Sequence, residues 1–341
     1  MEYIEASAPS DLPDFAKDAI NLADERLGAR IVSVTDDFFA PAARMISSMP
    51  PRFYPGRYDD HGKWMDGWES RRKRVEGYDQ CVVALAMPGQ ILGVEIDTRF
   101  FTGNYPPAAS LQACRCPDSE PTEQDEWVDI LDTVSLGPDH PHFFEVSVPG
   151  FWTHVRLNIF PDGGVARLRI YGRGQRPEPT ASGQVNLAAL EYGARVVACN
   201  NAHFGSPKQM LMPGAGLNMG DGWETRRRRE PGYDWCVIEL ATVGCIDAIV
   251  VDTAFFKGNF PDRCSIQGAY ITESTDQSLI TQSMFWQQIL PETSLSADAE
   301  HRFETELNDI GKVSHIRLNI HPDGGVSRFR VYGHSPKKDE S

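Results

Sequence analysis

The sequence predicts an all-β protein made of two tandem β-sandwiches of the jelly-roll type. Residues 154–172 recur as residues 315–333 with 14 of 19 positions identical, and residues 66–110 recur as residues 221–265 with 24 of 45 identical. Apolar and polar residues alternate along many short segments, which is the pattern of a half-buried strand. Long helical patterns are nearly absent, and the 29 glycines and 24 prolines fit many short strands joined by turns.

The repeat also sets the expected domain boundaries. Each copy is roughly 150–160 residues long, which is large enough for a hydrophobic core of its own. We therefore expect a first β-sandwich over residues 1–175 and a second over residues 183–335. Residues 173–182 are rich in Gly, Pro and polar residues, which is typical of a linker, and residues 336–341 are expected to form a polar tail.

Charge and hydropathy exclude several classes of partner. The net charge is −15, with 48 acidic against 33 basic residues, which argues against general binding to nucleic acid or to anionic membranes. No apolar run approaches the ~18 residues that indicate a membrane-spanning helix. The N-terminus lacks the basic and apolar regions of a signal peptide. We therefore expect a cytoplasmic protein with neither nucleic acid nor a membrane as a partner.

The cysteines favour the same compartment. There are seven of them, and they form no Cys-x-x-Cys pair. Cys81 and Cys236 occupy equivalent places in apolar segments, so we expect buried free thiols in a reducing cytosol. Cys114 and Cys116 have no counterpart pair in the second copy, which argues against a metal or redox role for them.

Along the chain, the first expected elements are two short helices, at residues 14–22 and 41–49. Residues 94–98 (V-E-I-D-T) alternate as a half-buried strand does. Residues 155–159 (V-R-L-N-I) alternate in the same way. The segment P-D-G-G at 161–164 lies between this run and the next one, and it predicts a hairpin turn in which Gly supplies a positive φ.

Each of these predicted hairpins carries polar residues along one face. The pattern His-x-Arg-x-Asn occupies residues 154–158 and again residues 315–319, with aliphatic residues on the opposite face. Arginines in such a position can tie loops together through carboxylates and carbonyl oxygens. His154 and His315 can be structural hydrogen-bonding residues or catalytic ones, because the histidine side chain titrates near neutral pH.

The densest polar cluster is D-G-W-E-S-R-R-K-R at 66–74, which recurs as D-G-W-E-T-R-R-R-R at 221–229. A solvated surface run does not need the same three arginine positions twice. The arginines can capture a planar carboxylate or a ureido oxygen through paired hydrogen bonds. They can equally form structural bridges to Asp or Glu, and the sequence leaves both interpretations open.

A second polar cluster begins at the end of a predicted strand. The segment D-T-R-F-F-T-G-N-Y-P at 97–106 matches D-T-A-F-F-K-G-N-F-P at 252–261. Loops at the strand ends of a rigid sandwich commonly carry functional sites. Asp97 and Asp252 can orient an arginine, accept a proton or bind substrate N–H groups, whereas the paired phenylalanines are expected to pack in the core.

The two copies differ most near their beginnings. Residues 35–39 (T-D-D-F-F) correspond to residues 200–204 (N-N-A-H-F), and the first copy has an insertion before its D-G-W-E turn. If only one true site exists per chain, these unequal segments would specialise it. On that reasoning His203, Asp36 and Asp37 are candidates.

Common cofactor motifs do not occur in the chain. It has no Walker loop, no Gly-x-Gly-x-x-Gly after a strand, no nucleophile elbow, no His-Glu-x-x-His and no EF-hand loop. The Gly-Gly pairs belong to turns. We therefore expect no cofactor and no metal ligands.

Four motifs stand in the same order and spacing in both halves: DGWExRRxR, GYDxC, DTxFFxGNxP and HxRLNIxPDGGVxRxRxYG. Together they resemble the allantoicase family, and the resemblance covers residues 20–335. It implies tandem jelly-roll repeats similar to galactose-binding or discoidin-like domains. It also implies a homo-oligomer that hydrolyses allantoate to ureidoglycolate and urea in purine and allantoin breakdown.

This reaction suits the residue types in the repeated motifs. Allantoate carries one carboxylate and two ureido groups on a single carbon, so expelling urea needs a proton, a positioned water and a carboxylate anchor. Arginine suits the anchor, and Asp, Glu or His suits the proton transfers. The candidate catalytic residues are Asp66, Glu69, Asp97, His154, Asp221, Glu224, Asp252 and His315. The candidate substrate-binding residues are Arg71, Arg72, Arg226, Arg227, Asn104, Asn259 and His203.

The competing function is a non-catalytic pair of sandwiches that binds a carbohydrate or another small ligand. It predicts exposed aromatic loops and does not require repeated sets of arginines and carboxylates, so the repeated charged motifs count against it. The sequence leaves open which copy is active, which carboxylate is the acid, and whether ureidoglycolate is also a substrate.

Overall fold

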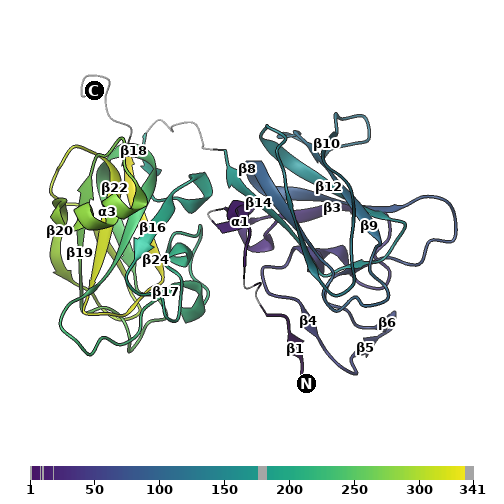
Figure 1. Cartoon of the computed structure of the whole chain (residues 1–341), viewed down its shortest axis with the longest axis horizontal. Coiled ribbons are helices and arrows are strands. Elements are labelled where there is room, and N and C mark those ends of the chain that lie inside the picture. The colour runs from purple at the N-terminus through teal and green to yellow at the C-terminus, as the bar shows by residue number, and fades with distance from the viewer. Residues whose placement is uncertain (1, 8, 10, 18, 176–182, 335–341) are drawn as a thin grey trace. The chain divides into compact units, whose positions relative to one another are not determined.

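The chain folds into two all-β units (Figure 1). The structure is a computed structural model that describes residues 2–7, 9, 11–17, 19–175 and 183–334. One compact unit is Met1–Gln175 and the other is Arg176–Ser341. The predicted all-β fold with two tandem sandwiches is confirmed. Most of the expected linker and the polar tail lie outside the described residues.

The bounds of the elements show how similar the two units are. The strands of the first unit are β1 (Ile4–Glu5), β2 (Ile20–Asn21), β3 (Arg30–Val34), β4 (Arg52–Phe53), β5 (Tyr58–Asp59), β6 (Gly62–Lys63), β7 (Trp68–Glu69), β8 (Asp79–Asp97), β9 (Ala108–Cys114), β10 (Val128–Ser135), β11 (Pro141–Glu145), β12 (Trp152–Phe160), β13 (Gly164–Val165) and β14 (Arg167–Gly174). Its helical elements are α1 (Asp14–Lys17) and the 3₁₀ turns η1 (Glu25–Leu27) and η2 (Ala42–Ile46).

The second unit repeats the order of β2, β3 and β7 to β14, and it has one longer helix. Its strands are β15 (Val185–Asn186), β16 (Arg195–Cys199), β17 (Trp223–Glu224), β18 (Asp234–Asp252), β19 (Arg263–Ala269), β20 (Gln287–Ser294), β21 (Glu300–Phe303), β22 (Lys312–His321), β23 (Gly325–Val326) and β24 (Arg328–His334). Its helical elements are α2 (Pro207–Met210), α3 (Asp276–Gln282), η3 (Leu190–Tyr192), η4 (Met219–Asp221) and η5 (Ser283–Phe285).

One long strand organises each unit. In the first unit, the N-terminal part of β8 pairs with β3 and β12, and its C-terminal part pairs with β11 and β14. All of these pairings are antiparallel. In the second unit, β18 pairs with β16, β22, β21 and β24 in the same manner. A single continuous segment thus contributes to both layers of its sandwich.

The prediction of a hairpin across residues 161–164 was wrong. β12 and β14 are consecutive long strands, but each pairs with β8: Leu157 lies opposite Cys81, and Ile170 lies opposite Val94. The physical reason is that alternation specifies which side chains are buried and does not specify the partner strand. A central strand as long as β8 can pair with several strands along its length. Here β12 pairs with its N-terminal part and β14 with its C-terminal part.

The polar face of β12 is covered, although the sequence predicted a half-buried strand. Arg156 is 8% exposed, and its guanidinium lies over the Trp127 ring at 4.3 Å from the ring centroid. Its Nε donates to Gln112 at 2.8 Å, and its Nη1 lies 2.9 Å from a carboxylate oxygen of Glu123. The arginine of the His-x-Arg-x-Asn pattern therefore ties a loop to the sheet.

The two expected N-terminal helices are shorter than predicted. The first is limited to α1, and residues 20–21 form β2, in which Asn21 lies opposite Tyr171. The Asn21 side-chain oxygen also accepts the backbone N–H of Ile170 at 2.8 Å. The second is the 3₁₀ turn η2. Tertiary hydrogen bonds to the sheet override a weak local helix preference here.

Gly164 and its counterpart Gly325 allow the closest packing in the two cores. A Cβ at Gly164 would lie 2.0 Å from the Phe101 ring, and one at Gly325 would lie 2.0 Å from the Phe256 ring. Both rings are fully buried. We expect Gly164→Ala to lower the free energy of unfolding by about 1–3 kcal/mol through overpacking, measured by urea denaturation. Gly103→Ala is the control, because a Cβ there meets nothing within 4 Å, and an equal loss in that variant would contradict the explanation.

Candidate functional site

A cavity of about 620 Å³ lies in the first unit where three polar turns meet. Its wall consists of Phe39, Glu69, Ser70, Arg72, Lys73, Arg74, Gly103, Asn104, Tyr105, Pro107, Pro161, Asp162 and Gly163. Cavities of roughly 300–1,000 Å³ are the usual size for small ligands. Three of the candidate residues, Glu69, Arg72 and Asn104, share this wall. We refer to it as the Glu69 cavity.

Strand pairing and a buried indole hold Glu69 in place. β7 pairs with β13, so that Glu69 lies opposite Gly164. The neighbouring Trp68 is fully buried and donates its indole N–H to the Asp36 carbonyl oxygen at 2.8 Å. The Asn104 side chain donates from Nδ2 to Glu69 Oε1 at 2.7 Å. The backbone carbonyl oxygen of Asn104 accepts the Gly164 N–H at 2.6 Å. Two segments that are distant in sequence therefore meet at one carboxyl group.

Burial raises the pKa of Glu69 above its ordinary value, and the hydrogen bond from Asn104 opposes this shift. Burial acts in this direction because the charged form of a carboxyl loses more hydration than the neutral form. A carboxyl with a raised pKa holds its proton closer to neutral pH. Such a group can donate a proton to a leaving group.

The basic residues of the 66–74 turn have different partners. Arg71 is held by Asp36, with 2.7 Å from Nε to Oδ2, and it is not part of the cavity wall. Lys73 is held by Asp79 at 2.5 Å. Arg72 and Arg74 line the cavity and form no ion pair with any residue that the structure describes. Of the predicted pair Arg71 and Arg72, only Arg72 faces the cavity with its guanidinium uncommitted.

Asp66 and Asp221 lie in a different place from the cavity. Asp66 Oδ2 accepts from Arg167 at 2.8 Å, and Asp221 Oδ2 accepts from Arg328 at 2.7 Å. Arg167 is 1% exposed and also donates to the carbonyl oxygens of Met49, Pro50, Asp66 and Ala166. Both aspartates therefore complete a buried arginine cluster that ties the D-G-W-E turn to the last strand.

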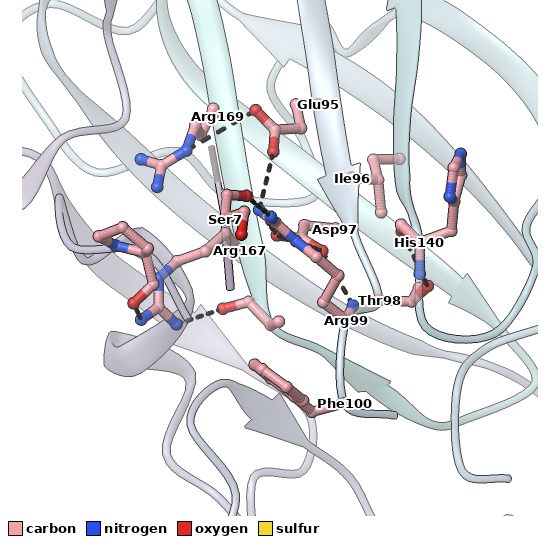
Figure 2. A network of polar contacts seen from close by, with 12 residues as sticks. Ser7, Glu95, Ile96, Asp97, Thr98, Arg99, Phe100, His140, Arg167 and Arg169 are labelled. Carbon is pink, nitrogen blue, oxygen red and sulfur yellow. Dashed lines mark hydrogen bonds and ion pairs between the residues drawn. The ribbon is translucent and has the colours of Figure 1, made fainter. Parts of the chain in front are cut away.

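Asp97 belongs to a buried network at the end of β8 (Figure 2). Both of its carboxylate oxygens accept from the Arg99 guanidinium, at distances of 2.6–3.0 Å. The network extends to Glu95, Arg169 and Tyr171. Asp252, the counterpart of Asp97, accepts the backbone N–H of Ala254, the residue that takes the place of Arg99 in the second unit.

His154 lies apart from the Glu69 cavity, in the wall of another cavity of about 420 Å³ in the first unit. Its Nδ1 is 2.9 Å from the Thr153 hydroxyl oxygen. Burial lowers the pKa of His154 below its ordinary value, and nearby Arg30 acts in the same direction. In the second unit His315 is 2.8 Å from the Ser314 hydroxyl oxygen, and burial lowers its pKa too.

The second unit has the same turns with less space between them. Glu224 accepts a hydrogen bond from Asn259, as Glu69 does from Asn104. The nearby cavity is about 280 Å³, and neither Glu224 nor Asn259 is part of its wall. Its wall consists of Asn201, Arg226, Arg227, Arg228, Arg229 and Glu230. His203 is exposed, with its ring against Phe204.

Several polar residues around these sites were not among the candidates. Arg74 and Tyr105 line the Glu69 cavity, and Glu95 and Arg99 belong to the buried network. For Glu95 a signal was present in the sequence: the aligned position in the second copy is Val250. A charged residue that replaces an apolar one inside an otherwise duplicated strand marks a difference that packing alone does not require.

The described part of the chain has neither a cluster of metal ligands nor a membrane-spanning helix. Across residues 2–175 and 183–334, apart from positions 8, 10 and 18, no group of three or more His, Cys, Asp or Glu side chains is arranged to hold a metal ion. Within the same part of the chain, no helix has the length and apolar character needed to span a membrane.

Comparisons with known proteins agree with the motifs. A family model described as the allantoicase repeat matches residues 20–175 and 185–336. A protein of Burkholderia mallei named "Probable allantoicase 1" is 56% identical over 323 residues, covering 94% of this chain and 96% of that protein. "Probable allantoicase" of Ralstonia nicotianae is 55% identical over the same shares. The crystal structure of allantoicase from Saccharomyces cerevisiae matches with a TM-score of 0.76 and 35% identity, covering 93% of this chain and 94% of that one.

Proposed function

This chain belongs to the allantoicase family, and from that premise we propose that the Glu69 cavity is where it hydrolyses allantoate. The enzyme converts allantoate to ureidoglycolate and urea in purine and allantoin degradation. The observation that supports this location is the meeting of a half-buried carboxyl, an amide and two uncommitted arginines in one cavity of suitable volume.

The anchor for the substrate carboxylate is Arg72, with Arg74 beside it. Two guanidinium groups without an ion pair in a cavity attract a small anion, and each can form paired hydrogen bonds to a carboxylate. Arg71 and Lys73 are already neutralised by Asp36 and Asp79, so Arg72 and Arg74 remain available to bind the substrate carboxylate.

Glu69 is the proton donor in this proposal. The C–N bond between the central carbon and one ureido nitrogen breaks, and the proton of the Glu69 carboxyl passes to that nitrogen, so that urea leaves as a neutral molecule. Water then supplies its oxygen to the carbon and a proton to the Glu69 carboxylate. The net change is the addition of one water, and the enzyme returns to its starting protonation state.

The first unit is favoured over the second as the place of this reaction. Glu224 and Asn259 repeat the hydrogen bond, but the cavity near them is smaller, and neither residue is part of its wall. A substrate in that cavity would therefore not meet the carboxyl group that corresponds to Glu69. Thus the proposed division gives catalysis to the first unit and leaves the equivalent turn of the second unit as scaffold.

Removing Arg72 tests the anchor. We expect Arg72→Ala to raise KM for allantoate by about 10- to 100-fold, because a charge-assisted hydrogen bond to a carboxylate is worth about 1.5–3 kcal/mol. Steady-state kinetics with urea release as the readout measures this. Arg227→Ala is the matched control in the second unit, and a larger effect there than in Arg72→Ala would contradict the assignment.

Asn104 provides a test through pH. Its amide lowers the pKa of Glu69 against the larger effect of burial, so Asn104→Ala removes the lowering contribution and raises that pKa further. A proton donor is active below its pKa, and activity falls as the pH rises through it. We therefore expect the alkaline limb of the kcat/KM profile to move to higher pH in Asn104→Ala. Asn259→Ala is expected to leave the profile unchanged, and a shift in that variant alone would contradict the proposal.

The non-catalytic binding alternative is not favoured by the family membership. Urea release from allantoate, assayed with and without a chelator, distinguishes the two directly. Loss of activity with the chelator would show that a metal takes part.

Two further expectations concern the location of the protein in the cell and its oligomeric state. The cytoplasmic location is supported by the seven cysteine thiols, four of which are buried. The homo-oligomer rests on the family resemblance. Analytical ultracentrifugation of the full chain tests the second expectation.

A further inference from the structure

The sheet face formed by β8 and β14 in the first unit carries a cluster of charged residues in its interior. Glu95 is 2% exposed, and its Oε2 accepts the Tyr171 hydroxyl at 2.7 Å. Asp97 lies two residues further along the same strand face and binds Arg99. Arg169 stands opposite Glu95 on the neighbouring strand. Figure 2 shows Glu95, Asp97, Arg99 and Arg169 grouped together.

The hydrogen-bonding capacity of this cluster is not filled. Among the residues that the structure describes, no donor reaches Glu95 Oε1. The Arg99 Nη2 atom is 3.8 Å from that oxygen, and the Arg169 Nε atom is 3.7 Å from Oε2. The Arg169 side chain donates one hydrogen bond within the described part of the chain, a long one of 3.4 Å to the Met49 carbonyl oxygen. A buried carboxyl oxygen without a hydrogen-bond donor is energetically unfavourable, because it has lost its hydration and gained no partner.

The duplicated scaffold does not need these charges. At the positions of Glu95 and Arg99 the second unit has Val250 and Ala254, yet β18 and β24 pair in the same register. The tyrosine is retained as Tyr332. The counterpart of Arg169 is Arg330, which donates to the carbonyl oxygens of four residues, Met210, Met212, Gly214 and Phe329. The same sheet therefore folds with its arginine bound to carbonyl oxygens and with Val250 at the place of Glu95.

The N-terminal segment covers the cluster in the first unit. The Ser7 carbonyl oxygen accepts from Arg99 Nη1 at 2.6 Å. The Phe15 ring of α1 packs against Tyr171, with 6.0 Å between the ring centroids. This cover consists of a few short elements, and α1 has only four residues. Ala16 and Ala19 are also buried beside Tyr171, so a ligand reaches the cluster only when this segment moves.

We propose that Glu95, Arg169 and Tyr171 form a second small-molecule site, confined to the first unit and covered by the N-terminal segment, that binds ureido acids. A ureido N–H donates to the free Oε1 of Glu95, and the carboxylate of the same molecule accepts from Arg169. The choice of this ligand class rests on the proposed function, since ureido acids are the substrate and product of the reaction. The site differs from the Glu69 cavity in every residue.

Binding of hydantoate tests this proposal. Hydantoate has one carboxylate and one ureido group on a single carbon and lacks the second ureido group of allantoate, so it reports binding without turnover. Isothermal titration of the full chain measures the number of molecules bound and their Kd. We expect two molecules per wild-type chain, and we expect Glu95→Gln to lose one of them or to weaken its binding at least tenfold. Glutamine keeps the size of the side chain and an oxygen for the Tyr171 hydroxyl.

One companion variant, Arg72→Ala, separates this proposal from the proposed function. It removes the anchor in the Glu69 cavity and is expected to weaken binding of the other hydantoate molecule. If Glu95→Gln leaves the number of bound molecules and their Kd unchanged, the second site does not exist, whatever Arg72→Ala does. If Glu95→Gln loses a molecule and Arg72→Ala loses none, the second site stands and the location of catalysis falls.

A variant that removes the same charge elsewhere on the first unit is the control for Glu95→Gln. Glu145→Gln on β11 removes the same charge at an exposed position, and its titration is expected to match that of the wild-type chain. Hydrogen–deuterium exchange gives a second readout: hydantoate is expected to change exchange in residues 11–17 of the wild-type chain and not of Glu95→Gln. Unchanged exchange in the wild-type chain would overturn the proposed cover.

Discussion

Glu69→Gln is expected to lower kcat for allantoate by about 10²–10⁴-fold, which is the usual contribution of a general acid. The amide keeps the size of the side chain and its contact with Asn104, but it carries no acidic proton. The loss should therefore appear in kcat, with KM changed little, because the Arg72 anchor is intact. Steady-state urea release over a range of allantoate concentrations separates the two constants.

The matched variant is Glu224→Gln in the second unit. This substitution removes the corresponding carboxyl from the equivalent turn. Glu224 accepts a hydrogen bond from Asn259, as Glu69 does from Asn104. We expect full activity in Glu224→Gln. Equal losses in the two variants would show that both units are catalytic, and full activity in Glu69→Gln would remove the carboxyl from the mechanism.

Asp66→Ala is expected to lower the free energy of unfolding of the first unit by about 3–5 kcal/mol. Removing one partner of a buried ion pair leaves the other charge without compensation, and losses of this size follow. The Arg167 guanidinium is 1% exposed and has Asp66 as its ion-pair partner within the described residues. Its remaining contacts are carbonyl oxygens, which carry only partial charges.

Urea denaturation of the full chain measures this effect. The two units have separate cores, so the transition of the first unit should move while that of the second stays in place. Asp221→Ala is expected to do the reverse, because Asp221 and Arg328 form the same pair in the second unit. Glu120→Ala is the control: its pair with Arg30 is more than half exposed, and such pairs contribute at most about 1 kcal/mol. A control loss as large as that of Asp66→Ala would contradict the argument.

The duplicated motifs predicted the fold class better than the strand pairing. Alternation and turn residues indicate strands because they are local properties of the chain. The partner of a strand is a property of the whole sheet, and β12 and β14 pair with β8 instead of with each other. The repeat made the prediction of two sandwiches possible, but it could not distinguish a hairpin from two strands on a shared central partner.

Long-range contacts also decided which of the candidate residues lie at the same site. In the sequence, Asp66, Glu69, Arg71 and Arg72 belong to one turn. In the structure, Asp66 is bound by Arg167, which is 101 positions away, and Arg71 is bound by Asp36, which is 35 positions away. Glu69 and Arg72 remain in the cavity wall. Adjacent residues in an extended segment point in different directions, so membership in one motif does not place them in one site.

By itself the sequence determined that the protein is all-β, that it is duplicated, and which family its motifs resemble. These follow from composition, local periodicity and the order of motifs, none of which requires knowledge of long-range contacts. Only the tertiary structure decided which polar residues meet: Glu69 with Asn104, Asp66 with Arg167, and Glu95 with Tyr171. The physical reason is that charge pairing and burial depend on strands and loops that lie far apart along the chain.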